Sequence, residues 1–321
     1  MKLSLVSDSL ANLPVEQMLS TAAAAGIQGI EFNTGNWSGA PHIDLDGLLE
    51  SQTARQALAD KLERHNLDLV AFNCNGNQLH PVTGAAHDKV VRDTIRLSGL
   101  MGLKTVVLMS GLPAANATDL VPNWITSSWP EENQTHLEWQ WAERLLPYWH
   151  DLVAYASSCG IEKLAIEMHG NQLVFSPATL MQLRAEVGPM VCANLDPSHL
   201  MWMGADAIQS VDYLGDAIAH VHGKDTFINA PVAATRTLLE NGPLVSARPR
   251  AWTHATIGVG HDLKWWTDFC YRLALVGYSG WVSIEHEDAT MSRNEGIKRA
   301  VSLLKDAMVL EDPDYQVQSV T

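Results

Sequence analysis

Eight short apolar runs, separated by helix-like stretches, recur along this chain of 321 residues. Runs of this kind predict buried strands, which we place at Leu3–Ser7, Gly29–Asn33, Leu67–Asn73, Thr105–Ser110, Lys163–His169, Val191–Asp196, Ile218–Lys224 and Trp281–Glu285. Strands that alternate with helices predict repeated βα units around a parallel sheet. Eight units favour a closed (β/α)8 barrel, with an open doubly wound sheet as the alternative. No GxGxxG motif follows the first run, which weakens the dinucleotide-binding form of that alternative.

The chain length fits one large domain, because α/β barrels of roughly 250 residues or more are routinely single units. We expect a barrel over residues 1–310 and a C-terminal tail over 311–321. Two connections are too long for simple turns, namely 111–132 after the fourth predicted strand and 226–260 after the seventh. Both connections begin at the downstream ends of strands, which is the rim where barrel active sites are built. We therefore expect them to form the walls and the lid of a substrate pocket.

Charge and cysteine content narrow the possible partners. The net charge of -15 disfavours nucleic acid, because binding to phosphates relies on clustered Lys and Arg. Four scattered cysteines predict small buried side chains and no disulfide framework, which fits a reducing cytoplasm. Acidic and polar residues appear by position eight, too early for a signal peptide, and no run approaches 18 apolar residues. We expect a cytoplasmic protein that makes no membrane contact.

Four of the predicted strands carry a carboxylate or an imidazole at or near the downstream end: Glu167 in KLAIEMH, Asp196 in VCANLDPSH, His222 in IAHVHGKD and Glu285 in WVSIEHED. In a closed barrel the downstream ends of the strands meet at one rim, so these side chains should converge. Three carboxylates and one imidazole suit one divalent cation, with Mn²⁺ as the first candidate and Mg²⁺, Co²⁺ or Zn²⁺ as alternatives. The structural alternative is pairing with Lys224 or Arg293, which we disfavour because unpaired carboxylates in apolar strands are costly.

Residues near these four are candidates for substrate contacts. His199 follows Asp196 by three residues, and Lys224 and Asp225 follow His222 by two and three residues. Because side chains alternate along a strand, His169 is expected to point to the same side as Glu167. The complete set of expected substrate contacts is His199, Lys224, Asp225, His169, Trp37, His42, Asn73 and Trp129. The alternative for the loop aromatics is that they only pin their loops in place.

With these motifs the chain resembles the xylose-isomerase-like TIM-barrel superfamily, also described as the sugar (phosphate) isomerase/epimerase family. The resemblance covers roughly residues 1–310 and is carried by IEMH, NLDPSH, HVHGKD and SIEHED. It implies a metal bound by Glu167, Asp196, His222 and Glu285, with the two glutamates also acting as catalytic acid and base. Sugar phosphates are not implied, since we find no phosphate-cradling motif in the chain.

The activity implied by the resemblance is isomerisation or epimerisation of a sugar. A cation bound to the substrate carbonyl would stabilise an enediolate, so that Glu167 and Glu285 can remove and return a proton. The alternative is a lyase or dehydratase acting on keto-sugars, of the inosose dehydratase type or as the catalytic subunit of a C-glycoside deglycosidase acting on 3-oxo-glycosides. Such a subunit needs a small partner subunit. Assembly into a homo-oligomer is the alternative.

Two further classes of protein fit the sequence less well, namely DNA-repair endonucleases and sugar-binding barrels without catalysis. The endonuclease IV branch of the superfamily carries extra histidine ligands for a three-metal cluster, whereas the fourth predicted strand here ends in Ser110 and the chain is acidic. A sugar-binding barrel without catalysis would not need the full ligand set. We therefore expect the partner to be a small sugar or keto-sugar.

Overall fold

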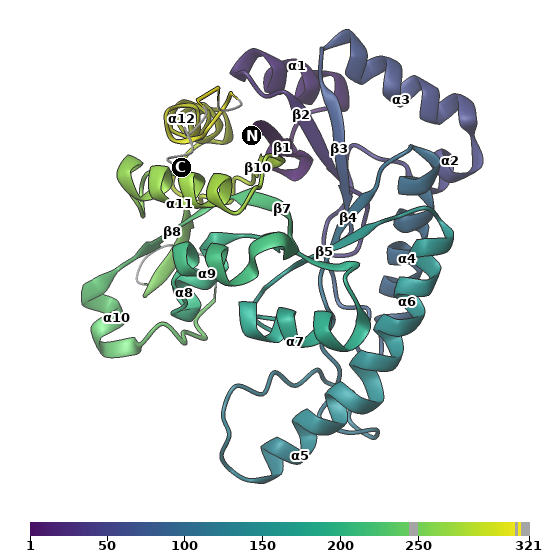
Figure 1. The fold of residues 1–321 in the computed structure, drawn as a ribbon, viewed down its shortest axis with the longest axis vertical. Coiled ribbons are helices and arrows are strands. Elements are labelled where there is room, and N and C mark those ends of the chain that lie inside the picture. The colour runs from purple at the N-terminus through teal and green to yellow at the C-terminus, as the bar shows by residue number, and fades with distance from the viewer. Residues whose placement is uncertain (244–249, 312–313, 316–321) are drawn as a thin grey trace, which may run out of the picture.

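The computed structural model describes residues 1–243, 250–311 and 314–315. Parallel strands close into a barrel, in which the last strand, β10, pairs with the first, β1 (Figure 1). The eight barrel strands are β1 Lys2–Val6, β2 Gly29–Asn33, β3 Asp68–Asn73, β4 Thr105–Leu108, β5 Lys163–Glu167, β6 Val191–Leu195, β7 Ile218–Gly223 and β10 Trp281–Ile284. The predicted (β/α)8 barrel is confirmed, and the open sheet is excluded.

Six of the eight strands end one or two residues earlier than the sequence predicts. The difference matters at the rim, where the polar residues lie. Glu167 is the last residue of β5, whereas Asp196 and Glu285 come directly after β6 and β10. These side chains therefore stand where the backbone leaves the sheet and turns toward the next helix.

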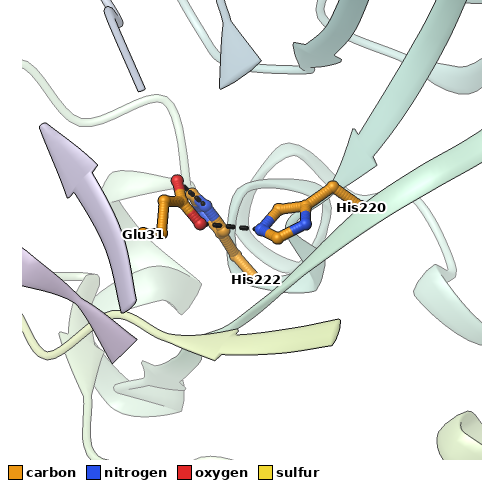
Figure 2. Close-up of side chains that lie close together, drawn as sticks. All are labelled: Glu31, His220 and His222. Carbon is orange, nitrogen blue, oxygen red and sulfur yellow. Dashed lines mark hydrogen bonds and ion pairs between the residues drawn. The ribbon is translucent and has the colours of Figure 1, made fainter. Parts of the chain in front are cut away.

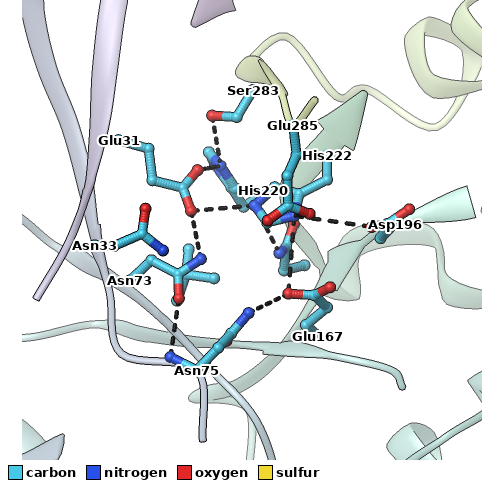
Figure 3. A network of polar contacts seen from close by, with 12 residues as sticks. Glu31, Asn33, Asn73, Asn75, Glu167, Asp196, His220, His222, Ser283 and Glu285 are labelled. Atoms are coloured by element: carbon cyan, nitrogen blue, oxygen red, sulfur yellow. Dashed lines mark hydrogen bonds and ion pairs between the residues drawn. The ribbon is translucent and has the colours of Figure 1, made fainter. Parts of the chain in front are cut away.

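Side chains alternate along the strands between the helix layer and the barrel interior. Ile30 and Phe32 of β2 belong to the hydrophobic core between strands and helices, and Glu31 between them is fully buried and points inward (Figure 3). A separate small cluster of Ala71, Val107 and Ala165 comes from neighbouring strands. These small side chains leave space in the barrel for buried polar residues.

Helices surround the barrel (Figure 1). Their bounds are α1 Val15–Ala25, α2 Leu45–Glu50, α3 Gln52–Arg64, α4 Gly84–Leu100, α5 Glu132–Trp139, α6 Leu146–Ser158, α7 Pro177–Val187, α8 Pro197–Met203, α9 Ala207–Leu214, α10 Ala230–Arg236, α11 Leu263–Leu275 and α12 Arg293–Ala307. Shorter pieces are the 3-10 helices η1 Ser7–Leu10 and η3 Gly215–Ala217 and the π-helix η2 Gln140–Leu145. Trp149 of α6 and Trp266 of α11 are fully buried in the core between barrel and helices.

The connection after β4 was expected to wall a substrate pocket, but it supplies none of the residues that line the pocket at the barrel rim. It runs irregularly, with an isolated bridge between Ala114 and Pro122, and leads into α5, which projects from the barrel at the bottom of Figure 1. Gln140 of the π-helix donates hydrogen bonds from Nε2 to the carbonyl oxygens of Ala114 at 3.1 Å and Asn123 at 2.8 Å. With α7 this connection lines a cavity of about 600 Å³ that includes none of the four predicted ligands.

The connection after β7 contains regular structure that the sequence analysis did not predict. Strands β8 Asp225–Ile228 and β9 Trp252–Ala255 pair in antiparallel fashion, with α10 between them. Part of this connection, 244–249, lies outside the described residues. Because β9 pairs with β8 directly after β7, it returns His254 to the barrel rim.

Three remaining expectations concern the chain as a whole. None of the described helices has the length and apolar character needed to cross a bilayer. The four cysteines are free thiols, of which Cys159 is partly exposed and the others are buried. Most of the predicted tail, 312–313 and 316–321, lies outside the described residues.

Candidate metal centre and active site

The four predicted ligands Glu167, Asp196, His222 and Glu285 lie together at the barrel rim, and we call them the quartet (Figure 3). One ligand atom from each lies within 4.8 Å of a ligand atom from every other. His222 Nδ1 is 3.6 Å from Glu285 Oε2, 3.8 Å from Glu167 Oε2 and 4.0 Å from Asp196 Oδ2. The imidazole nitrogen thus faces three carboxylates from three other strands.

Two atoms of the quartet are buried without a hydrogen-bond partner, namely His222 Nδ1 and Asp196 Oδ2. Leaving a buried polar atom without a partner is costly, and such atoms are uncommon in native proteins. Carboxylate oxygens and an imidazole nitrogen are ligands for Mn²⁺, Mg²⁺, Co²⁺ and Zn²⁺. The residues present therefore fit one divalent cation, which would give both atoms a partner.

The carboxylates of the quartet experience different electrostatic surroundings. Burial raises the pKa of Glu167 to about 8, with His222 opposing this shift and Glu285 adding to it. Burial also raises the pKa of Asp196, against the attraction of Lys224. For Glu285, the effect of burial is outweighed by Lys224 and His222, which lower its pKa. Two neighbouring glutamates thus have pKa values shifted in opposite directions.

Lys224 directly follows β7 and is buried against the quartet, with only 3% of its side chain exposed. Its Nζ lies 2.6 Å from Glu285 Oε2, 3.1 Å from Glu287 Oε2 and 3.3 Å from Asp196 Oδ2. The pairing considered as the structural alternative therefore exists for Lys224. Arg293, in contrast, donates hydrogen bonds to the backbone carbonyls of residues 8 and 9.

A pocket of about 170 Å³ opens beside the quartet. Its lining residues come from several strand ends and are Asp8, Asn33, Trp37, Ser38, Asn75, Met109, Glu167, His169, His199, Lys224, Glu285 and Glu287. The expected substrate contacts Trp37, His169, His199 and Lys224 are thus part of this pocket. The ring of Trp37 lies 6.1 Å from that of His169.

Three histidines form one side of the site. His199 Nε2 lies 2.9 Å from Glu167 Oε1 and 3.3 Å from Asp196 Oδ2. The ring of His199 is 4.1 Å from that of His169 and 5.4 Å from that of His254. Burial lowers the pKa of each of these three histidines, which favours neutral imidazoles. His254 was not among the expected contacts, and it reaches this position because β9 pairs with β8.

Four expected substrate contacts lie elsewhere, and the prediction for them needs correction. Asp225 Oδ2 accepts hydrogen bonds from the backbone N–H groups of residues 258, 260 and 261, so this carboxylate anchors the end of the long connection. His42 donates from Nε2 to the carbonyl of residue 13 at 2.9 Å and lines a different surface pocket. Asn73 is fully buried against Glu31. Trp129 is 79% exposed in the projecting connection, away from the 170 Å³ pocket.

Glu31 and His220 were missed by the sequence analysis. Together with His222 they form a second group of possible metal-binding atoms deeper in the barrel, which we call the buried cluster (Figure 2). Glu31 lies inside β2, and His220 precedes His222 by two residues in β7, so both imidazoles face the interior. The signal available in the sequence was the spacing of HVH together with a glutamate inside the apolar run GIEFN.

Asp8 and Asn75 complete the polar lining of the pocket. Asn75 donates a hydrogen bond from Nδ2 to Glu167 Oε2, and its own backbone N–H is held by Asn73 Oδ1 at 2.9 Å. Asp8 follows β1, and its Oδ1 is buried without a hydrogen-bond partner. Burial raises the pKa of Asp8, with Ser38 opposing the shift through a hydrogen bond. Both residues extend the site beyond the strands that supply the quartet.

The chain belongs to the xylose isomerase-like TIM barrel family, whose model matches residues 19–307. The chain is 48% identical over 311 residues to the uncharacterized protein YfiH of Bacillus subtilis (strain 168), covering 96% of this chain and 99% of that protein.

Solved structures resemble the chain in fold. The probable 3-DHS dehydratase AsbF from Bacillus anthracis has a TM-score of 0.67 at 15% identity, covering 95% of this chain and 99% of that one. The IOLI protein with a bound zinc atom has a TM-score of 0.62 at 20% identity, covering 96% and 99%. A D-tagatose 3-epimerase-like protein has a TM-score of 0.61 at 18% identity, covering 95% and 99%. At these identities the likeness establishes a shared fold.

Proposed function

We propose that this protein is a divalent-metal-dependent sugar isomerase or epimerase. The observation that carries the proposal is the quartet, whose unpartnered ligand atoms lie next to a pocket on the barrel rim. Mn²⁺ is our first candidate, with Mg²⁺, Co²⁺ and Zn²⁺ as alternatives, because the donors are oxygen and nitrogen atoms without thiolates. When bound, such an ion would polarise a substrate carbonyl and stabilise the negative charge that develops as a neighbouring C–H loses its proton.

The size and the charge of the pocket indicate a small, neutral substrate. Its volume of about 170 Å³ is below the range of about 300–1,000 Å³ that is typical of pockets for drug-sized ligands. Four carboxylates line it, from Asp8, Glu167, Glu285 and Glu287, against one ammonium group, from Lys224. Like charges placed next to one another are unfavourable, so this lining disfavours phosphate and carboxylate groups. We infer a polyhydroxylated ketone or aldehyde of monosaccharide size.

Glu167 and Glu285 are the proposed acid and base. Their pKa values are shifted in opposite directions, to about 8 for Glu167 and below the ordinary range for Glu285. Carboxyl groups whose pKa values are pushed apart are typical of sites where one removes a proton and the other supplies one. Asn75 donates to Glu167 and Lys224 to Glu285, and these contacts orient the two side chains.

The other lining residues would recognise the sugar. His169 and His199 present neutral imidazoles, which can exchange hydrogen bonds with hydroxyl groups. Trp37 is 52% exposed at the mouth and offers a flat apolar surface for the carbon face of a sugar ring. Residue His254, next to His199, adds an imidazole from the connection after β7.

Elimination is the second candidate reaction, and Lys224 is the observation that favours it. Its ammonium lies 2.6 Å from Glu285 Oε2, so a proton donor stands beside a possible base. After proton removal, a hydroxyl or alkoxide on the next carbon could leave with its bonding electrons and take a proton from Lys224, giving an unsaturated ketone. This reaction covers dehydration of an inosose. For a 3-oxo-C-glycoside the bond that breaks is carbon–carbon, the aglycone carbon takes the electrons and the proton, and a small partner subunit would be needed.

The proposal is tested by hydrogen exchange from solvent. Protein stripped with a chelator and then given Mn²⁺ should lose and regain incorporation of deuterium from D₂O into one member of a panel of neutral ketoses, inososes and 3-oxo-glucosides. A re-isolated epimer or isomer supports the first candidate, and an unsaturated ketone or a released aglycone supports the second. Absence of exchange with every member of the panel contradicts both.

Two further parts of the proposal concern the cell. We propose a cytoplasmic location and assembly either with a second copy of the chain or with a small partner subunit. Cell fractionation and light scattering of the purified protein test these statements, and secretion or a purely monomeric active enzyme would contradict them.

A further inference from the structure

Glu31 makes contacts with both histidines of β7 although it lies outside the quartet (Figure 2). Its side chain is fully buried in the barrel. Glu31 Oε2 lies 2.7 Å from His220 Nε2, and Oε1 lies 3.1 Å from His222 Nε2. Asn73 donates a hydrogen bond from Nδ2 to Oε1 at 2.8 Å. Glu31 is therefore a carboxylate surrounded by hydrogen-bond donors.

The contact with Glu31 determines which ring nitrogen of His222 carries the hydrogen. Nε2 of His222 has two neighbours at 3.1 Å, Glu31 Oε1 and the side-chain amide of Asn194. An ionised carboxylate can only accept hydrogen bonds, so the Glu31 contact requires the hydrogen on Nε2, and the Asn194 amide then turns its oxygen to the ring. In a neutral imidazole the other nitrogen then has a free lone pair. That nitrogen is Nδ1, the atom that lies 3.6–4.0 Å from the carboxylates of Glu167, Asp196 and Glu285. The hydrogen and the lone pair of His222 thus point to opposite groups.

We propose that Glu31 is a positioning residue that fixes the orientation and the tautomer of His222, so that Nδ1 is available to a cation in the quartet. The inference depends on the metal site of the proposed function. Metal-binding histidines commonly donate their second ring N–H to a carboxylate, and loss of that partner typically weakens metal binding by about 10–100-fold. His220 supports the arrangement because it occupies Oε2 and leaves Oε1 to His222 and Asn73.

The buried cluster could instead be a second metal site, since its ligand atoms also lie within 4.8 Å of one another. The surrounding contacts argue against this. The Asn73 amide directs its N–H at Glu31, and Ser283 Oγ lies 3.1 Å from His220 Nε2 and 2.6 Å from Ser4 Oγ (Figure 3). A cation there would have to displace donors that already satisfy Glu31, whereas His222 Nδ1 and Asp196 Oδ2 of the quartet have no hydrogen-bond partner.

The test measures binding of Zn²⁺ alone to metal-free protein by calorimetry. We expect Glu31→Gln to bind Zn²⁺ about 10–100-fold more weakly than the unaltered protein, with one ion per chain in both. Asp288→Asn is the matched control, because Asp288 is also a buried carboxylate and its contacts are with Thr256 and Thr290 rather than with the quartet. Its Zn²⁺ affinity should remain unchanged.

A second measurement does not need a variant and decides the matter if Glu31→Gln fails to fold. In ¹⁵N-histidine-labelled, Zn²⁺-loaded protein, NMR should find His222 protonated at Nε2 and coordinating through Nδ1. The reverse assignment overturns the inference, as does a folded Glu31→Gln protein that keeps the original affinity. Two Zn²⁺ ions per chain, one of them lost in Glu31→Gln, would show that the buried cluster is itself a metal site. No Zn²⁺ binding by the unaltered protein would refute the metal site of the proposed function, and the inference with it.

Discussion

The quartet and the buried cluster have similar composition but differ in how their polar atoms are satisfied. Both bring carboxylates and imidazoles within 4.8 Å, and they share His222. In the buried cluster both oxygens of Glu31 accept hydrogen bonds. In the quartet, His222 Nδ1 and Asp196 Oδ2 have no hydrogen-bond partner. Asp196 Oδ2 has only ion-pair neighbours, Lys224 Nζ and His199 Nε2, each at 3.3 Å. Proximity of ligand residues therefore does not by itself distinguish a metal site from a structural network, whereas the completeness of the hydrogen bonding does.

The difference follows from depth in the barrel. Glu31 and His220 lie within strands, so side chains of adjacent strands, such as Asn73 and Ser283, surround them and supply hydrogen bonds (Figure 3). Asp196 and Glu285 follow their strands, where the backbone turns away and leaves a pocket on one side. The same residue types can thus form a hydrogen-bonded network inside the barrel and a ligand-binding site at its rim.

The largest effect is expected from the quartet. Glu167→Gln and Glu285→Gln each remove a proposed proton-transferring group while keeping its size, and each should reduce solvent deuterium exchange by about 10²–10⁴-fold. Both should also bind Mn²⁺ more weakly because a ligand charge is lost. Exchange rates and calorimetry on the two variants measure this. Unchanged exchange in both variants would mean that the quartet is a structural network like the buried cluster, and the proposed difference between the two groups would be wrong.

The next prediction concerns Lys224, whose ammonium group balances the negative charge of the quartet carboxylates when no metal is bound. Lys224→Met leaves Glu285 and Asp196 without their ammonium partner, and breaking a buried ion pair in this way typically costs about 3–5 kcal/mol. Urea unfolding of the metal-free variant measures the loss. Added Mn²⁺ should restore part of it, because the cation supplies positive charge to the same carboxylates. Equal loss with and without Mn²⁺ would contradict the view that Lys224 and the metal neutralise the same groups.

The barrel could be predicted from the sequence because its strands are buried on both faces and read as continuous apolar runs. The β8–β9 pair could not, because it joins residues 24 to 30 positions apart, and the runs DTFI and WTHA are short and partly polar. As a result His254 was expected only as part of the long connection over the pocket and was not named as a substrate contact. Trp129, in contrast, was expected to contact the substrate but does not line the pocket. The sequence shows that its connection is long but not in which direction the connection extends.

The quartet was predictable because a parallel barrel places the ends of all its strands on one rim, whatever the exact register. The sequence shows polar residues inside the runs of β2 and β7, but which of them meet depends on which strands lie opposite each other in the closed sheet. Asp225 shows the same limit, because its position three residues after His222 suggested a substrate contact, whereas its hydrogen-bond donors come from 258–261.

The smallest predicted effect comes from a carboxylate that is satisfied like Glu31 but lies outside both groups. Burial disfavours the charge of Asp288, yet hydrogen bonds from Thr290 and Thr256 outweigh it and lower its pKa below the ordinary value of 3.8. The unfolded chain therefore takes up this proton at a higher pH than the folded protein does. The stabilisation is present above about pH 4 and is lost as the pH falls through the folded-state pKa. Asp288→Asn should lower the free energy of unfolding by about 1 kcal/mol at pH 7, with less difference at pH 3, as measured by urea unfolding at both values. A change in Mn²⁺ affinity in this variant would contradict the separation of hydrogen-bonded carboxylates from metal-binding ones.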